Sequence, residues 1–297
     1  MFPNIVRMDS VTELLKILQL QEQGNNTYMG NSKTIGSPNV FGGQVLAQAL
    51  NAAYRTIDNG RITHSLHAYF LEAGKLELPI FFEVAIIRDG GSFSTRRVTA
   101  LQEGKIIFIL SASFHREEEG YEHQMEMKRD IPQPEELMGW QDLLIEYGDF
   151  LPKGRKSFLE IERPVEFKPT VIPNPMDKKD LPPVNDVWFK VKEPINGLSL
   201  PLKQQILTYI SDYNILPTTL LPNGSDAHYG NVQMASLDHS MWFFRDFDFE
   251  DWMLFSLESP SANKARGFAR GHIYSRTGEL IASVAQEGLI RPKTEKD

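Results

Sequence analysis

The segment SLDHSMWFFR, residues 236–245, contains a serine, an aspartate and a histidine within four positions. These are the residue types of a charge-relay hydrolase, in which a base activates a serine nucleophile. The segment is rich in aromatic and apolar residues, which predicts a β-strand. Because side chains alternate between the two faces of a strand, Ser236 and His239 are expected on opposite faces. A triad of Ser236, Asp238 and His239 is therefore excluded, and these polar residues need another explanation.

The composition limits which other chemistry the chain can perform. The 297 residues are 41% hydrophobic and 24% charged, enough apolar material for one large domain or two ordinary ones. Cysteine is absent, so disulfides, thiol nucleophiles and cysteine-ligated metals are excluded. A formal net charge of −8 argues against a nucleic-acid partner, although a local basic patch can still hold a phosphorylated ligand. No HExxH, EF-hand or P-loop pattern occurs, so neither a metal nor a bound cofactor is expected.

The ends of the chain carry no targeting pattern. The N-terminal segment MFPNIVRMDSVTELLKIL lacks the apolar region and cleavage site of a signal peptide. Instead, Ser10 and Glu13 fit the capping box of an amphipathic helix. No run of about 18 apolar residues predicts a membrane span, and the final KTEKD differs from the peroxisomal SKL signal. We therefore expect a cytoplasmic protein.

The rest of the sequence predicts two similar halves, each a helix followed by an antiparallel meander. The helices are expected at residues 42–55 and 201–213. Strands are expected near 27–35 and at 62–71, 78–90, 92–102 and 105–114 in the first half, and at 232–244, 252–259, 265–275 and 280–290 in the second. Residues 116–155 are acidic and then weakly helical, which is typical of a connector, and 172–186 are expected to form a surface loop.

An internal duplication explains this pattern better than a chance likeness of two meanders. HSLHAYFLEAG parallels ASLDHSMWFFRD, and TALQEGKIIFILSASF parallels HIYSRTGELIASVAQEG. The pair Ser65-Leu66 lies 171 residues before Ser236-Leu237, and Gly104 lies 174 residues before Gly278. One length difference of three residues reconciles the two offsets.

The chain resembles the acyl-CoA thioesterase II family over nearly its whole length. Six blocks in the same order carry the resemblance: FGGQVLAQAL (41–50), HSLHAYFL (64–71), RDGGSFSTRRV (88–98), SDYNILP (211–217), SLDHSMWFFRDF (236–247) and SVAQEGLIR (283–291). The resemblance implies an α+β double hotdog fold, two helix-wrapped antiparallel sheets joined in one chain. The units would be residues 1–115, a connector at 116–155, and 156–297 with the catalytic residues.

The resemblance also implies hydrolysis of fatty acyl-CoA to free acid and coenzyme A, without a cofactor. In the family a carboxylate, a hydroxyl and a glutamine position a water molecule, and the matching residues are Asp212, Ser236 and Gln286. The hydroxyl residue is commonly threonine in the family, so Ser236 is a departure that keeps the oxygen but loses rotamer restriction. The carboxylate would accept a proton as the water attacks the thioester.

Each of these residues also has a purely structural interpretation. Asp212 follows an apolar helical run and could cap local backbone groups; the Ser236 hydroxyl could bond to a neighbouring strand, and the Gln286 amide to backbone. Asp238 and His239 are interpreted as structural. His64 and His67 are expected on opposite strand faces, which excludes a shared metal. The position paralleling Gln286 in the first half falls at or near Ser113.

Coenzyme A is multiply phosphorylated, so local cations are needed to hold it. Lys264, Arg266 and Arg270 in the second half and Arg96 and Arg97 in the first are candidates, with ordinary solvated strand charges as the alternative. The Gly42-Gly43 start of the first helix offers backbone N–H groups to an anion or carbonyl. Close helix packing is an equal alternative for these glycines.

Two other functions stay open. A hotdog hydratase or dehydratase would move water across a carbon double bond with a histidine or a carboxylate pair, and the absence of a site histidine disfavours it. A non-catalytic acyl-CoA binding protein would use the same polar residues only to satisfy one another. The acyl-chain length is left undetermined, and a homo-oligomer, a dimer or tetramer, is expected only by resemblance.

Overall fold

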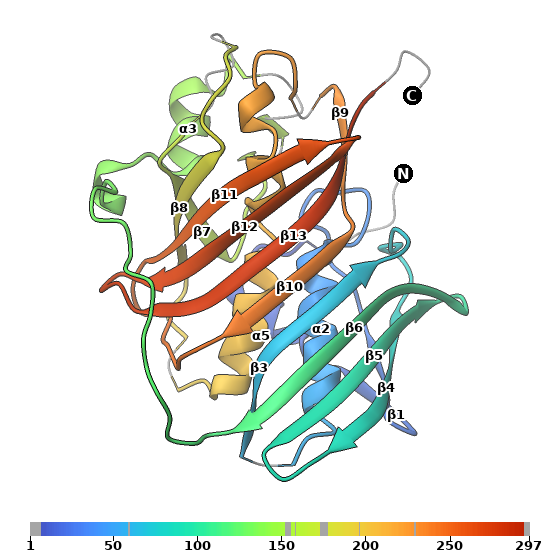
Figure 1. Ribbon diagram of the computed structural model, residues 1–297. Coiled ribbons are helices and arrows are strands. Elements are labelled where there is room, and N and C mark those ends of the chain that lie inside the picture. Colours follow the sequence, from blue (N-terminus) through green and yellow to red (C-terminus); the bar gives the residue numbers. More distant parts are fainter. Residues whose placement is uncertain are drawn as a thin grey trace.

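A single antiparallel sheet of thirteen strands organises the described part of the chain (Figure 1). This computed structural model describes residues 7–58, 60–151, 156–157, 159–172, 178–195, 197–228 and 230–293. The strands follow one another in the order β1-β2-β4-β5-β6-β3-β10-β13-β12-β11-β8-β7, and β9 pairs with β13 beside β10. The predicted joining of two antiparallel sheets in one chain is confirmed.

The first half begins with a capped helix and continues, apart from β1, with the predicted elements. Ser10 accepts a hydrogen bond from the Glu13 backbone at 3.3 Å, which caps helix α1. Its elements are α1 (Val11–Ile17), β1 (Gln21–Gly24), β2 (Thr27–Gly30), α2 (Gly42–Tyr54), β3 (Arg61–Phe70), β4 (Ile80–Asp89), β5 (Phe93–Gln102) and β6 (Lys105–Arg116).

The second half follows the connector, which holds the short η1 (Pro134–Glu136) and α3 (Trp140–Tyr147). Its elements are β7 (Val165–Pro169), β8 (Val184–Val191), α5 (Leu200–Ser211), α6 (Ile215–Thr218), η2 (Leu221–Asn223), β9 (Val232–Ser236), β10 (Asp238–Phe243), β11 (Met253–Asn263), β12 (Arg266–Ser275) and β13 (Leu280–Pro292).

The strands of the two halves occupy equivalent positions on either side of the centre of the sheet, which is the structural evidence for the duplication. Counting outward from the central pair β3–β10, β6 corresponds to β13, β5 to β12 and β4 to β11, with β2 and β1 corresponding to β8 and β7. The central pair is antiparallel, with Ala68 opposite His239 and Leu66 opposite Met241. An approximate twofold axis therefore passes through the middle of the sheet.

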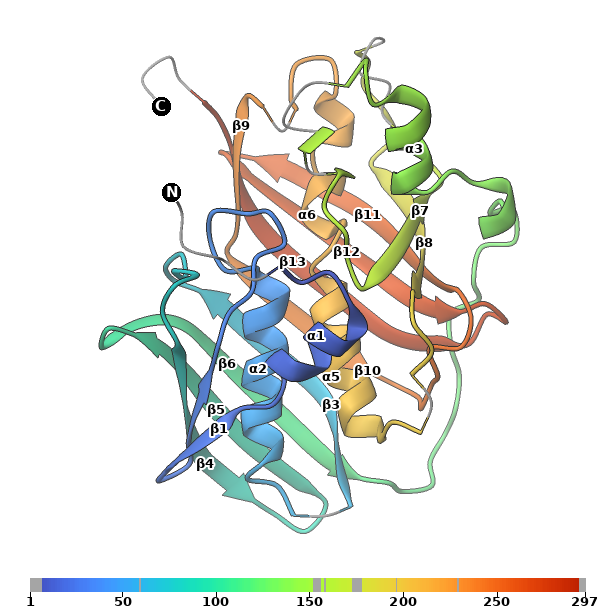
Figure 2. The same cartoon turned by 180° about the vertical axis from the view of Figure 1, so that it is seen from behind.

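Helices α2 and α5 pack side by side against one face of the sheet, and α1 lies beside them (Figure 2). Helix α2 is rich in alanine, leucine and glutamine, which are good helix formers. The buried residues of both helices join one apolar core with inward residues of strands from both halves, such as Leu66, Leu110 and Met241. The two halves thus share one interior, and α2 and α5 contact each other within it.

The strand registers define which residues of the two halves correspond. One extra residue interrupts β3 between Thr63, opposite Phe114, and Ser65, opposite Ser113. One extra residue also follows Ser236, which pairs with Gly288 before the register shifts at β10. Such bulges change the side-chain alternation. Thr63, rather than Ser65, is therefore the counterpart of Ser236, which corrects the alignment made from sequence alone.

Two further counterparts follow from the same registers. Three residues beyond Thr63 and Ser236 are Leu66 and His239, both fully buried. Two residues before Phe114 and Gly288 are Ala112 and Gln286, both 1% exposed. Ser113, named from sequence, faces away and bonds His64 at 2.8 Å.

Some elements differ from the prediction. Residues 232–244 form two strands rather than one, because the extra residue separates β9 from β10. Strands β1 and β7 were not predicted, and β8 begins at Val184, inside the expected loop 172–186. Part of that loop, the predicted boundary at residue 155 and the last four residues of the terminal KTEKD lie outside the described residues. No helix within the described ranges is long and apolar enough to cross a membrane.

Candidate active site

Asp212 lies where the helices of the two halves meet. It is the C-terminal cap of α5, with helical φ and ψ of −83° and −7°. A carboxylate at this end of a helix faces the negative pole of the helix dipole, which is unfavourable. The opposing group is the N-terminus of α2, whose Gly43 backbone hydrogen-bonds the carboxylate. Helix α2 has no side-chain cap, so its first amides are available for this contact.

The two glycines that begin α2 make this approach possible. A Cβ on Gly42 would lie 2.7 Å from Oδ2 of Asp212, and a Cβ on Gly43 would lie 2.4 Å from the carbonyl oxygen of Tyr209. Real Cβ atoms do not tolerate such contacts, so any side chain here would separate α2 from the end of α5. The sequence suggested two interpretations of Gly42-Gly43, close helix packing and donation by backbone N–H groups. Both describe the same contact, and the anion in it is the carboxylate of Asp212.

Burial raises the pKa of Asp212 from its ordinary 3.8 to about 7. Desolvation is the largest cause, and hydrogen bonding from Gln286, the Gly43 backbone and Ser236 opposes it only in part. The residue keeps some exposure, but its Oδ1 is enclosed and has no hydrogen-bond partner among the described residues. A carboxyl group that titrates near neutrality is suited to accept a proton from water.

Ser236 and Gln286 lie beside this carboxylate on neighbouring strands. Gln286 Nε2 on β13 donates to Ser236 Oγ, at the end of β9, at 2.8 Å. Both residues also hydrogen-bond Asp212. The structure therefore brings together all three residues named from sequence, although 74 residues of chain separate Asp212 from Gln286.

The strand argument against a catalytic triad was right in its conclusion but wrong in its geometry. The extra residue after Ser236 resets the alternation, so His239 faces inward with Gln286 rather than away from it. The two residues are bridged by Gln286, whose Oε1 lies 2.5 Å from His239 Nδ1 and whose Nε2 bonds Ser236. Because the amide lies between them, the histidine is not placed as the base of a serine nucleophile.

His239 is thus a site residue that the strand pattern placed on the wrong face. The spacing of three residues between Ser236 and His239 predicts a shared face only if the bulge between them is already known. Asp238, in contrast, has a backbone partner, since its Oδ1 accepts from the Glu287 N–H at 2.6 Å. That bond spans the bulge and holds the irregular backbone in place.

Most of the cations considered for coenzyme A already hold carboxylates. Arg96 is 2% exposed and bonds Asp89 at 2.8 Å. Arg266 and Arg270 bond glutamates on adjacent strands at 2.9 and 2.6 Å. These three arginines stabilise the sheet, which leaves little of their charge for a phosphate.

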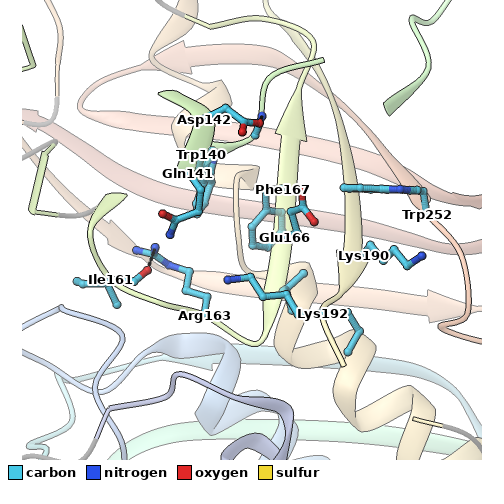
Figure 3. Close-up of a pocket in the computed structure, with 13 residues that line it drawn as sticks. Trp140, Gln141, Asp142, Ile161, Arg163, Glu166, Phe167, Lys190, Lys192 and Trp252 are labelled. Carbon is cyan, nitrogen blue, oxygen red and sulfur yellow. Dashed lines mark hydrogen bonds between the residues drawn. The ribbon is translucent and has the colours of Figure 1, made fainter. Parts of the chain in front are cut away.

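A pocket of about 530 Å³ opens over β7, β8 and α3 (Figure 3). Phe167 lies at its centre between Trp140 and Trp252, and the lining includes Lys190 on β8 and Lys192, the residue after this strand. The pocket also contains the acidic residues Asp142 and Glu166 and the buried Arg163.

Aromatic contacts connect this pocket with the site. The Phe167 ring lies 5.0 Å from that of Tyr213, the residue after Asp212, and Tyr213 lies 4.5 Å from Phe41, the residue before α2. An apolar wall therefore runs from the pocket to the carboxylate. Among the described residues no group of three or more His, Asp or Glu is placed to hold a metal ion.

Comparison with known proteins places this geometry in a family. A family described as acyl-CoA thioesterase matches residues 155–289, and one described as acyl-CoA thioesterase N-terminal domain matches residues 30–115. Acyl-CoA thioesterase 2 of Haemophilus influenzae is 37% identical over 95% of this chain and 98% of its own. Human acyl-coenzyme A thioesterase 8 is 36% identical over 98% and 92%.

A solved structure agrees. The acyl-CoA thioesterase II TesB2 of Mycobacterium marinum superposes with a TM-score of 0.76 at 34% identity, covering 95% of this chain and 98% of that one. A hotdog-fold protein from Alicyclobacillus acidocaldarius, 16% identical, shares the fold with a TM-score of 0.75. With relatives this similar over almost its whole length, the chain belongs to the acyl-CoA thioesterase II family and has the double hotdog fold.

Proposed function

We propose that this protein hydrolyses acyl-CoA to a free fatty acid and coenzyme A, with Asp212 as general base. The observation that carries the proposal is the enclosed carboxylate whose pKa is about 7, in contact with a serine hydroxyl and a glutamine amide. The names of its relatives, acyl-CoA thioesterases of bacterial and human origin, support the same substrate.

In the proposed reaction Ser236 and Gln286 hold a water molecule and Asp212 removes its proton as its oxygen attacks the thioester carbonyl carbon. The tetrahedral intermediate then collapses, the carbon–sulfur bond breaks, and the coenzyme A thiolate leaves. Because a thiol has an ordinary pKa of about 8.5, this leaving group needs no strong acid. No covalent intermediate with Ser236 is required.

Release of free thiol from acyl-CoA, followed with a thiol reagent, tests the proposal directly. A thioesterase releases one thiol for each acyl-CoA consumed. A hydratase would change the absorbance of an enoyl-CoA without releasing thiol, and a binding protein would shift the melting temperature without consuming substrate. The histidine whose expected absence disfavoured a hydratase is present as His239, but its Nδ1 contacts the Gln286 amide. Thiol release no faster than the uncatalysed rate would exclude the proposed function.

We assign the coenzyme A portion of the substrate to the pocket over β7 and β8. Lys190 and Lys192 form no ion pair with the described residues, whereas three of the arginines considered earlier do. Cations on the pocket wall favour the phosphorylated end of the substrate over its acyl chain.

Removing both charges, as Lys190→Gln with Lys192→Gln, should raise KM for acyl-CoA about five- to tenfold, because partly exposed ion pairs contribute up to about 1 kcal/mol each. The same substitutions should leave hydrolysis of an N-acetylcysteamine thioester unchanged, since that substrate lacks the nucleotide. Lys105→Gln, in the first half, is the matched control. Equal changes with both substrates would contradict the assignment.

A cytoplasmic location and assembly into a dimer or tetramer complete the proposal. Large apolar side chains are exposed on the central strand β3 and directly after β10, among them Tyr69 and Phe244, which are 57% and 52% exposed. Such side chains are suited to contact a second copy. Light scattering of the purified protein tests the assembly, and a single monomeric species at micromolar concentration would exclude it.

A further inference from the structure

His239 is a buried histidine with a partner for each ring nitrogen. It is 0% exposed, on β10. Its Nδ1 lies 2.5 Å from Oε1 of Gln286, and its Nε2 lies 3.0 Å from the hydroxyl of Ser211, the residue before Asp212. A continuous series of hydrogen bonds therefore runs from Ser211 through His239 and Gln286 to Ser236.

The chemistry of these partners decides where the protons lie. The Gln286 carbonyl oxygen can only accept, so His239 Nδ1 must carry a hydrogen. Burial lowers the pKa of His239 to about 4, so the ring is neutral near pH 7 and its Nε2 is an acceptor. The Ser211 hydroxyl must then direct its one hydrogen to Nε2 rather than to the Thr208 carbonyl oxygen, which lies 2.9 Å away. The histidine is thus expected as its Nδ1–H tautomer, whose donor points at the glutamine.

The Nδ1–H tautomer of His239 is compatible with only one of the two orientations of the Gln286 amide. If the amide were rotated by half a turn, its NH2 group would face the Nδ1–H of His239, and two donors would oppose each other in a buried site. The carbonyl oxygen would then face Ser236. Only the observed orientation presents the NH2 group to Ser236 and to the Asp212 carboxylate.

We propose that His239 is a positioning residue that fixes the Gln286 amide, so that its NH2 group faces the serine and the carboxylate. The inference rests on the proposed function of that site. The first half supports it, because the counterparts of Gln286 and His239 are Ala112 and Leu66. Where the glutamine is absent, the histidine is absent as well.

A pair of substitutions tests the role. His239→Leu introduces the residue that the first half holds at this place, and His239→Asn keeps a donor near the position of Nδ1. We expect His239→Leu to lower kcat about ten- to a hundredfold, the size of effect that removal of an orienting partner produces in other sites. KM should change less than about twofold, and His239→Asn should recover part of kcat.

A double-mutant cycle separates positioning from general support of the fold. If His239 acts through the amide, His239→Leu should lower kcat no further in a Gln286→Ala background. Additive losses, or an unchanged kcat in the single His239→Leu variant, would overturn the inference. An unchanged kcat in Gln286→Ala alone would instead overturn the proposed site. These results are distinguishable in one set of assays.

A spectroscopic measurement on the unmodified protein keeps the test independent of folding. Labelling with 15N-histidine reports the tautomer of each ring, and the signal of His239 among the seven histidines is the one missing from the His239→Asn variant. We expect a protonated Nδ1 and an unprotonated Nε2 at pH 7. An Nε2–H tautomer would overturn the inference, whatever the kinetics.

Discussion

The C-terminal ends of α2 and α5 are equivalent places in one duplicated fold, but their polar groups are arranged differently. At the end of α5, a carboxylate is enclosed and one of its oxygens lacks a partner among the described residues. At the end of α2, the Tyr54 hydroxyl bonds Gln204 and accepts from the Thr63 N–H at 2.8 Å, and Gln204 donates to the Thr63 carbonyl at 2.8 Å.

The second arrangement is neutral and, apart from the Thr63 hydroxyl, its polar groups bond one another. It contributes to stability, because a satisfied buried network avoids desolvation penalties. The first arrangement leaves a carboxyl group poorly solvated, which destabilises the fold but produces a base that titrates near neutral pH. The comparison teaches that the chemistry here depends on an incompletely satisfied carboxyl group, which only the second half has at this place; the buried polar atom without a partner at the other end is the uncharged Thr63 hydroxyl.

The largest expected effect follows from removing the base. Asp212→Asn keeps the shape of the side chain but cannot accept a proton, so kcat should fall by roughly two to four orders of magnitude. Tyr54→Phe, at the corresponding helix end, should leave kcat near the parent value. The two rates are measured by thiol release, and an Asp212→Asn variant that folds and turns over at the parent rate would refute the assignment.

Although it lowers kcat, the Asp212→Asn substitution should increase the stability of the fold. Because burial raises the pKa of Asp212 from 3.8 to about 7, the folded protein binds this proton more tightly than the unfolded chain. The destabilisation is absent below pH 4, grows as pH rises and is complete above pH 7. Asp212→Asn should therefore stabilise the protein by up to about 4 kcal/mol above pH 7, less near pH 5.

Urea denaturation at pH 5 and pH 8 measures this difference. A gain of the same size at both pH values would show that the carboxylate is not the cause. The pH dependence of kcat/KM supplies a second reading, since it should rise through about pH 7 as Asp212 loses its proton.

Removal of the Gln286 side chain should cause a smaller loss of kcat. Gln286→Ala should lower kcat roughly ten- to a hundredfold, somewhat less than the loss of a donor in an oxyanion hole, because Ser236 still contacts the carboxylate. In the first half alanine already occupies the corresponding place, so Ala112→Ser is the matched control and should leave kcat unchanged. Equal losses in both variants would indicate a general effect on the shared core rather than on the site.

The smallest effect is expected at the hydroxyl. Ser236→Thr keeps the oxygen with a stiffer rotamer and introduces the residue found at the counterpart Thr63, so kcat should stay within about threefold. Ser236→Ala should lose more, and its loss should not add to that of Gln286→Ala if both residues hold one water. Fully additive losses would argue for separate roles.

Much of this arrangement could be predicted from the sequence. Both central helices and the meander strands have clear periodicity, and the duplicated order of elements predicted one double sheet. The three site residues were found by matching motifs. Sequence alone could not supply the bulge after Ser236, because an extra residue in a strand has no marked propensity signal. That one irregularity decided the face of His239 and the true counterpart of Ser236.

Strands β7 and β8, at one end of the sheet, were missed for a different reason. The segments VEFKP and VNDVWFKV are short and carry charges, and VEFKP ends in a proline, which is typical of loops. They become strands only because β11 offers an edge to β8, with Phe255 opposite Val187, and β8 in turn offers one to β7, which is tertiary information. The pocket wall that bears Lys190 and Lys192 was unpredictable for the same reason.

The contact between the start of α2 and the end of α5 also bears on stoichiometry. The second half contributes the Asp212 carboxylate, and the first half contributes the Gly43 backbone N–H that meets it. If the halves were separate chains, random association would also form pairs with two carboxylates and pairs with none. The peptide linkage through residues 116–155 guarantees one of each in every molecule, so a first half without a base does not reduce the number of complete pairs.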